Sequence, residues 1–272
     1  MSMPGIVVHR RWPGRASALA IALSSLCLAA PADVGAAEPA PASDDRADER
    51  RAMVAEIAED ARSTRSWTGR ATFDDGVMAA MARVPRHRFV PADLAAAAYR
   101  NRPLPIGGGQ TISQPYIVAL STELVEPRPE HVVLEVGTGS GYQAAVLAEL
   151  VRRVHSIEIV ESLGREAAQR LAKLGYDNVE LRIGDGYQGW PEAAPFDGIV
   201  VTAAAPEVPE ALVAQLKPGG RMVIPVGPSF GNQELVLIEK QSDGTVTRRT
   251  VLPVRFVPMT GTAQDTHRER KR

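Results

Sequence analysis

Residues 132–143 read VVLEVGTGSGYQ, and this stretch decides how the rest of the chain is interpreted. The apolar run 132–136 predicts a buried strand, and residues 143–151 predict a helix. Between them lie three glycines, Gly137, Gly139 and Gly141. Glycine lets the backbone approach a ligand closely. This order of elements therefore indicates a binding crevice at the carboxyl end of the first strand of an open α/β sheet.

The glycines are spaced G-x-G-x-G, which differs from the G-x-G-x-x-G that seats a pyrophosphate against a helix. An acidic residue, Glu135, lies two positions before the first glycine. A cofactor with an ammonium and a sulfonium but no phosphate suits this arrangement, which favours S-adenosylmethionine. A plain tight turn and the turn of an NAD-dependent dehydrogenase are the alternatives.

Two further carboxylates stand where predicted strands end. Glu158 follows the first glycine by about twenty residues, where a carboxylate can accept both hydrogen bonds of a ribose diol. Asp185 lies between two glycines after the third strand and can turn inward to meet an adenine amino group. An exposed strand end and an ordinary Asp-Gly turn are the alternatives for these residues.

The pattern around this stretch predicts a Rossmann-like α/β fold with a mostly parallel, doubly wound sheet. Strands are expected at 132–136, 154–159, 179–183, 198–202, 222–226, 235–239 and about 251–257, and helices at 143–151, 162–174 and 209–216, with a turn at 217–220. Upstream, Met53, Val54, Ile57 and Ala61 recur at helical spacing, and Asp74 or Asp75 could cap a second helix. These elements predict a helical N-terminal preface, followed by a long loop at 101–116.

The N-terminus has the order of a secretory leader, with arginines before an apolar run at 16–30 and small residues after it. An uncleaved extension is the alternative. We expect a leader at 1–37, a linker at 38–50, a preface with the active-site loop at 51–128, a cofactor-binding core at 129–260 and a basic tail at 261–272. The compartment stays open, because the cofactor is made in the cytoplasm whereas the leader would direct the chain to the periplasm or outside.

Composition excludes several kinds of site. The formal net charge is -1, which favours neither nucleic acid nor an anionic membrane as a partner. Cys27 is the only cysteine, and the five histidines are scattered, so we expect no disulfide framework and no metal. We also expect no stable membrane association and a monomer.

Four segments resemble the protein-L-isoaspartate O-methyltransferase family. They are VPRHRFV at 84–90, LPIGGGQTISQPY at 104–116, EVGTGSGYQ at 135–143 and VRFVP at 254–258, so the resemblance covers roughly residues 84–259. The TISQP segment is the diagnostic one, because many methyltransferases share the glycine motif. The chain departs from the family in its longer N-terminal part and at Gly108.

The resemblance implies transfer of a methyl group from S-adenosylmethionine to the free α-carboxylate of L-isoaspartyl residues, and weakly of D-aspartyl residues, in damaged proteins. S-adenosylhomocysteine is the product, and the ester collapses to a succinimide that reopens partly to aspartate. The implied catalytic residue is Ser113. Cofactor residues are Glu135, Gly137, Gly139, Gly141, Glu158 and Asp185, and substrate residues are Thr111, Ile112, Gln114, Val254 and Phe256.

Such an enzyme would need no general base, because a carboxylate is already ionised at neutral pH. A hydroxyl at Ser113 could orient the carboxylate by one hydrogen bond without strongly reducing its nucleophilicity. Three alternatives remain: a loop hydroxyl bonded to its own backbone, a non-catalytic module that recognises damaged peptides, and a methyltransferase for another carboxylate.

Overall fold

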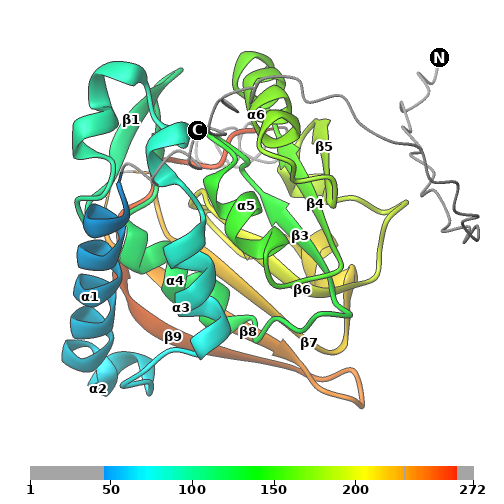
Figure 1. Cartoon of the computed structure of the whole chain (residues 1–272). Coiled ribbons are helices and arrows are strands. Elements are labelled where there is room, and N and C mark those ends of the chain that lie inside the picture. The colour runs from blue at the N-terminus through cyan, green and yellow to red at the C-terminus, as the bar shows by residue number, and fades with distance from the viewer. Residues whose placement is uncertain (1–45, 230, 262–272) are drawn as a thin grey trace, which may run out of the picture. The chain divides into compact units, whose positions relative to one another are not determined.

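A seven-stranded sheet organises the part of the chain that the computed structural model describes, residues 46–229 and 231–261 (Figure 1). In spatial order its strands are β5 Val179–Ile183, β4 Arg153–Glu158, β3 Val132–Val136, β6 Phe196–Val201, β7 Leu216–Val226, β8 Gln233–Lys240 and β9 Val246–Val254. The predicted leader at 1–37 and nearly all of the predicted tail lie outside the described residues.

The five strands from β5 to β7 run parallel, whereas β8 and β9 are antiparallel to their neighbours. This confirms the prediction of a mostly parallel sheet. At the centre, Val136 of β3 pairs with Ile157 of β4 on one side and with Val201 of β6 on the other. The chain therefore leaves three adjacent strands at the same edge of the sheet.

Neighbouring residues of each strand face two separate cores, as expected for a sheet that is covered on both faces. Val133 belongs to one core with the helices α1, α3, α4 and α5, whereas Leu134 belongs to the other with Tyr187, Trp190 and Leu212. The covering helices of the core region are α5 Tyr142–Ala148, α6 Glu161–Lys173 and α7 Glu210–Ala214, with a short 3-10 helix η3 Gly186–Gln188.

The helical preface is confirmed. It comprises α1 Ala47–Ser63, α2 Arg65–Thr68, α3 Asp75–Arg83 and the 3-10 helices η1 Arg86–Phe89 and η2 Ala92–Ala97. Met53, Ile57 and Ala61 are buried along α1 as their spacing predicted, and the Asp74 side chain caps α3 by accepting from the Gly76 N–H. Helix α1 begins at Ala47, so residues 47–50 are helical and not part of a linker.

The prediction of an irregular loop at 101–116 was wrong. Strands β1 Leu104–Gly107 and β2 Gln110–Ile112 form an antiparallel hairpin, and helix α4 Pro115–Leu124 begins before the expected loop ends. Gly107, Gly108 and Gly109 all have positive φ, and Gly108 and Gly109 make the turn between the strands. Glycine and proline here mark a tight turn and a helix start, not the absence of structure.

The end of the chain also differs from the prediction. Strand β9 ends at Val254, three residues before the expected end, and residues 255–257 lie outside it. The turn expected at 217–220 lies inside β7, where it forms an irregularity between the Phe196–Leu216 and Gly198–Arg221 pairs. A bulge of this kind interrupts the pairing only locally, so that β7 pairs with β6 both before and after it. The apolar pattern of the sequence alone does not distinguish such a bulge from a turn that ends the strand.

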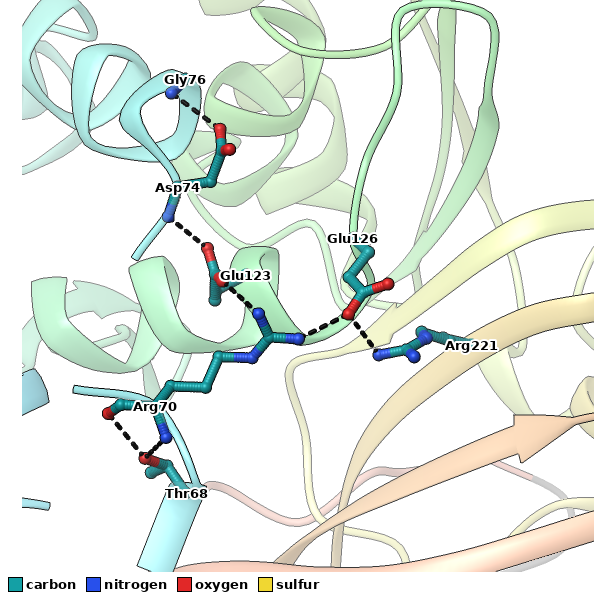
Figure 2. A network of polar contacts seen from close by, with 7 residues as sticks. All are labelled: Thr68, Arg70, Asp74, Gly76, Glu123, Glu126 and Arg221. Atoms are coloured by element: carbon teal, nitrogen blue, oxygen red, sulfur yellow. Dashed lines mark hydrogen bonds and ion pairs between the residues drawn. The ribbon is translucent and has the colours of Figure 1, made fainter. Parts of the chain in front are cut away.

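One polar network ties the preface to the sheet (Figure 2). Arg70 donates to Glu123 at 2.8 Å and to Glu126 at 2.5 Å, and Arg221 of β7 donates to Glu126 at 2.8 Å. Glu123 is 5% exposed and also accepts from the Asp74 N–H. The segment before α3, the end of α4 and β7 are therefore held together by charge-assisted hydrogen bonds.

We predict that Arg70→Met lowers the free energy of unfolding by about 1–3 kcal/mol, because the buried Glu123 carboxylate loses its ionic partner. Urea unfolding at neutral pH would measure the change. The matched control is Arg83→Met, which breaks the more exposed Arg83–Glu149 pair and should change stability by less than about 0.5 kcal/mol. Equal losses in the two variants would contradict this account.

Candidate active site

A cavity opens at the carboxyl edge of the parallel strands and encloses about 760 Å³, including its open mouth. Its walls come from the ends of β3, β4 and β6, from the hairpin end at β2, and from the segment after β9. The lining includes Thr111, Ile112, Ser113, Glu135, Gly137, Gly139, Glu158, Gly186, Thr202 and Met259. Most of the residues predicted for the site are thus brought to one place, as expected for this edge of such a sheet.

The glycine turn is shaped by positive φ angles and by Thr202. Gly137 has a φ of 96°, and a Cβ there would collide with the Thr202 hydroxyl. Thr202 Oγ1 donates to the carbonyl of Gly137 at 2.5 Å and lies 3.1 Å from that of Val136. Only glycine meets both requirements at this position, since it tolerates positive φ and leaves room for the hydroxyl.

Glu158 fixes the other side of the turn. Its Oε2 accepts from the Gly139 N–H at 2.7 Å, and its Oε1 accepts from the Val160 N–H at 2.9 Å. The side chain is 5% exposed and lines the cavity. Each carboxylate oxygen has a second lone pair, so Glu158 can hold the backbone and still accept from a ligand.

Glu135 lies deeper in the cavity and is fully buried. Its Oε2 accepts from the Ser156 hydroxyl at 2.5 Å, whereas its Oε1 has no hydrogen-bond partner among the described residues. Burial, helped by the nearby Glu158, raises the pKa of Glu135 to about 8. An unsatisfied buried carboxylate oxygen is costly, and a cationic group of a ligand would satisfy it.

Two predicted cofactor residues do not line the cavity. Gly141 precedes α5, where its φ of 87° and close packing against Leu171 require glycine. Asp185 caps η3 by accepting from the Tyr187 N–H at 2.9 Å, and it is the next residue, Gly186, that lines the cavity. Asp185 therefore lies at the margin of the site.

A second cavity adjoins the first on the side of α1, α4 and the end of β9. Its lining includes Asp60, Thr64, Gln114, Tyr116, Val254, Arg255 and Phe256. Thr111, Ser113 and Thr202 line both cavities. The predicted substrate residues Gln114, Val254 and Phe256 are thus separated from the predicted cofactor residues by a boundary that contains Ser113.

Ser113 lies between the end of β2 and the start of α4. Its carbonyl accepts from Arg86 Nη2 at 2.7 Å. Its hydroxyl has no hydrogen bond to any other described residue. This differs from the alternative of a loop hydroxyl bonded to nearby backbone.

The sequence analysis did not identify three residues that shape this region. Thr202 ends a predicted strand, as Glu158 does, so the same argument applied to β6 could have found it. Gln233 is buried and fixes the backbone of Phe256 through both of its amide atoms, at 2.6 and 3.3 Å. Gln233 carries no local sequence signal, and Arg86 lies in the segment 84–90 that resembles the family, where nothing distinguishes it from its neighbours.

Two absences concern residues 46–229 and 231–261, the part of the chain that the structure describes. Within these ranges, no three His, Cys, Asp or Glu side chains are grouped so that they could hold a metal ion. No helix in this part of the chain has the length and apolar character that crossing a membrane requires.

Comparison with known proteins identifies relatives of the chain. The family model of protein-L-isoaspartate(D-aspartate) O-methyltransferase matches residues 65–264. Protein-L-isoaspartate O-methyltransferase 2 of Polaromonas sp. is 63% identical over 209 residues, which are 77% of this chain and 99% of the relative. The enzyme of the same name from Syntrophobacter fumaroxidans is 60% identical over 236 residues, 87% of this chain and 94% of the relative.

Solved structures of the same family superpose on this chain. A protein-L-isoaspartate O-methyltransferase superposes with a TM-score of 0.69 at 29% identity and covers 82% of this chain and 69% of that chain. A putative enzyme of this kind from Plasmodium falciparum, in complex with S-adenosyl-L-homocysteine, has a TM-score of 0.63 at 25% identity and covers 76% and 98% of the two chains. The expected Rossmann-like methyltransferase fold is thereby confirmed, and the chain belongs to the protein-L-isoaspartate(D-aspartate) O-methyltransferase family.

Proposed function

We propose that the boundary between the two cavities is where this protein carries out its family's reaction. That reaction is the repair of damaged proteins by methylation of L-isoaspartyl residues, and the family match and the named relatives support it for this chain. The single observation that carries the proposal is that Ser113, Thr111 and Thr202 line both cavities. A methyl donor in the first cavity and a carboxylate in the second would meet at this boundary. D-aspartyl residues are the weaker substrates in this proposal.

The first cavity fits the cofactor. S-adenosylmethionine supplies a methyl group on a cationic sulfonium and also carries an ammonium. Glu135 has the unsatisfied oxygen that an ammonium requires, and Glu158 can accept hydrogen bonds from a ribose. Gly137 and Gly139 themselves place no side chain in the cavity, and Gly141 and Asp185 support the turn and its margin.

Ser113 is the proposed catalytic residue, because its hydroxyl can donate to the substrate carboxylate. Thr202 is less suited to this task, since its hydroxyl is already committed to backbone carbonyls. The carboxylate is ionised at neutral pH, so orientation and exclusion of water are what the protein must provide. Thr111 would position the acceptor from the hairpin side, Ile112 would bound the site from the donor cavity, and Gln114, Val254 and Phe256 would contact the flanking peptide.

We further propose the division of the chain expected from its sequence, with a leader at 1–37, a linker that ends before Ala47, a preface up to 128, a core at 129–260 and a basic tail. The near-neutral net charge supports proteins and not nucleic acid as partners, with the monomer as the working unit. Fractionating cells and sequencing the N-terminus should find a chain that begins after the small residues that follow the apolar run at 16–30, as expected for a cleaved leader. An intact Met1 in the cytoplasmic fraction would contradict the leader.

We predict that Ser113→Ala lowers kcat for an isoaspartyl peptide by about 10- to 100-fold, because the carboxylate loses its orienting hydrogen bond. Binding of S-adenosylhomocysteine should be retained, since Ser113 lies at the edge of the donor cavity. The assay counts base-labile methyl esters on paired peptides that differ only in an L-isoaspartyl or L-aspartyl linkage.

The control for this substitution is Ser66→Ala, which removes an exposed hydroxyl of α2 and should leave turnover unchanged. Full activity of Ser113→Ala would refute the catalytic role of Ser113. Cofactor binding by the unaltered protein without labelling of either peptide would instead redirect the search to other carboxylates.

We also predict that affinity for S-adenosylhomocysteine rises about 20-fold between pH 6 and pH 7.5, by proton linkage to a single carboxyl group. The pKa of Glu135 near 8 means that its carboxyl is mostly neutral at pH 6, and binding of an ammonium favours the ionised form. The range stays below the ordinary pKa of an α-amino group, about 8, so the ligand remains a cation. Calorimetry across the range would measure the affinity.

Glu135→Gln should bind with an affinity that is nearly independent of pH and close to that of the unaltered protein at pH 6. The exposed Glu130→Gln is the matched control and should keep the pH dependence. A Glu135→Gln variant with undiminished affinity at pH 7.5 would show that Glu135 does not hold the ammonium.

A further inference from the structure

Arg86 is the largest fully buried side chain in the described part of the molecule, with an exposed fraction of 0%. Its Nε donates to the carbonyl of Ala98 at 2.8 Å, and its Nη2 donates to the carbonyl of Ser113 at 2.7 Å. The guanidinium carbon lies 4.7 Å from the centre of the Tyr142 ring. A single side chain therefore contacts the preface, the active-site loop and the first residue of α5.

Burial of this cation is expensive. Among the described residues no carboxylate forms an ion pair with Arg86, and its Nη1 is buried without a hydrogen-bond partner. Burial lowers the pKa of Arg86 to about 10, which still leaves the side chain charged at neutral pH. An apolar residue would fill the same space at less cost, so packing alone does not account for an arginine here.

Arg86 contacts the active site at two places, the backbone of Ser113 and the ring of Tyr142. Gln114 makes no capping hydrogen bond at the start of α4, and the Asn101 side chain instead accepts from the Tyr116 N–H at 3.0 Å. The bond from Arg86 to the Ser113 carbonyl fixes the backbone at Ser113 itself, three residues before the contact made by Asn101. Tyr142, stacked under the guanidinium, directly follows the glycine turn and lines the donor cavity.

We propose that Arg86 is a positioning residue for methyl transfer, which holds the Ser113 loop in register with the glycine turn of the donor cavity. It acts through Ser113 and touches neither the cofactor nor the acceptor in this role. The inference rests on the proposed catalytic function of Ser113. Its chemistry requires the forked guanidinium, because only a fork bonds two carbonyls and stacks on a ring at once.

The test compares Arg86→Lys and Arg86→Met with the matched control Arg88→Met, which changes an exposed arginine of the same 3-10 helix. Arg86→Met should lower kcat by about 10- to 100-fold, the loss that a small misplacement of a reacting group produces. Arg86→Lys, which keeps the charge and one donor, should recover part of this loss. In both variants, S-adenosylhomocysteine should bind with nearly unaltered affinity, and Arg88→Met should leave all values unchanged.

A double-mutant cycle with Ser113→Ala separates positioning from general support. If Arg86 acts through Ser113, adding Arg86→Lys to Ser113→Ala should cause little further loss of kcat, because the hydroxyl to be positioned is already absent. Additive losses would overturn the proposal, as would an Arg86→Lys variant that fails to fold, because Arg86 would then be a residue of general stability. Full activity of Ser113→Ala alone would instead refute the proposed function of Ser113.

Discussion

The parallel pairing of β3 with β4 on one side and β6 on the other is the constraint on which the rest of the structure depends. It brings the ends of three strands to one edge, so that the glycine turn, Glu158 and Thr202 become neighbours although they are far apart in sequence. The turn is then held from both sides, by the Glu158 carboxylate and by the Thr202 hydroxyl. Such rigid support allows a donor site to be open before any ligand arrives.

The site contains two buried charged or chargeable groups of opposite kind, and each is incompletely satisfied within the described residues. Glu135 has one oxygen without a partner in the donor cavity, whereas Arg86 has one nitrogen without a partner behind the active-site loop. Groups of this kind reduce stability, and proteins retain them mainly where function needs them. The network of Arg70, Glu123 and Glu126 lies at the opposite end of the parallel strands. Each charged group in this network has an ionic partner, so the network offsets part of the loss of stability.

The sequence predicted the parallel part of the fold well because its strands carry patterns typical of strands: residues 132–136 are apolar except for Glu135, and residues 179–183 alternate apolar and charged side chains. Val179–Ile183 and Val132–Val136 have the expected bounds, and the glycine turn and Glu158 lie at the expected edge. The hairpin at 104–112 was missed because its glycines were taken as signs of a loop, and α4 was not identified because nearly all of its residues are buried. The support from Arg86 and Gln233 could not be predicted either, since each bonds to backbone atoms of segments that only the folded chain brings near.

Helix α1 lines one of the two cavities and not the other. Asp60 and Thr64 form part of the wall of the acceptor cavity, yet both lie before residue 65, where the family match begins. The donor cavity, in contrast, is built entirely from residues inside the match. A substitution on this face of α1 can therefore reshape one wall beside the acceptor without touching any residue that lines the donor cavity.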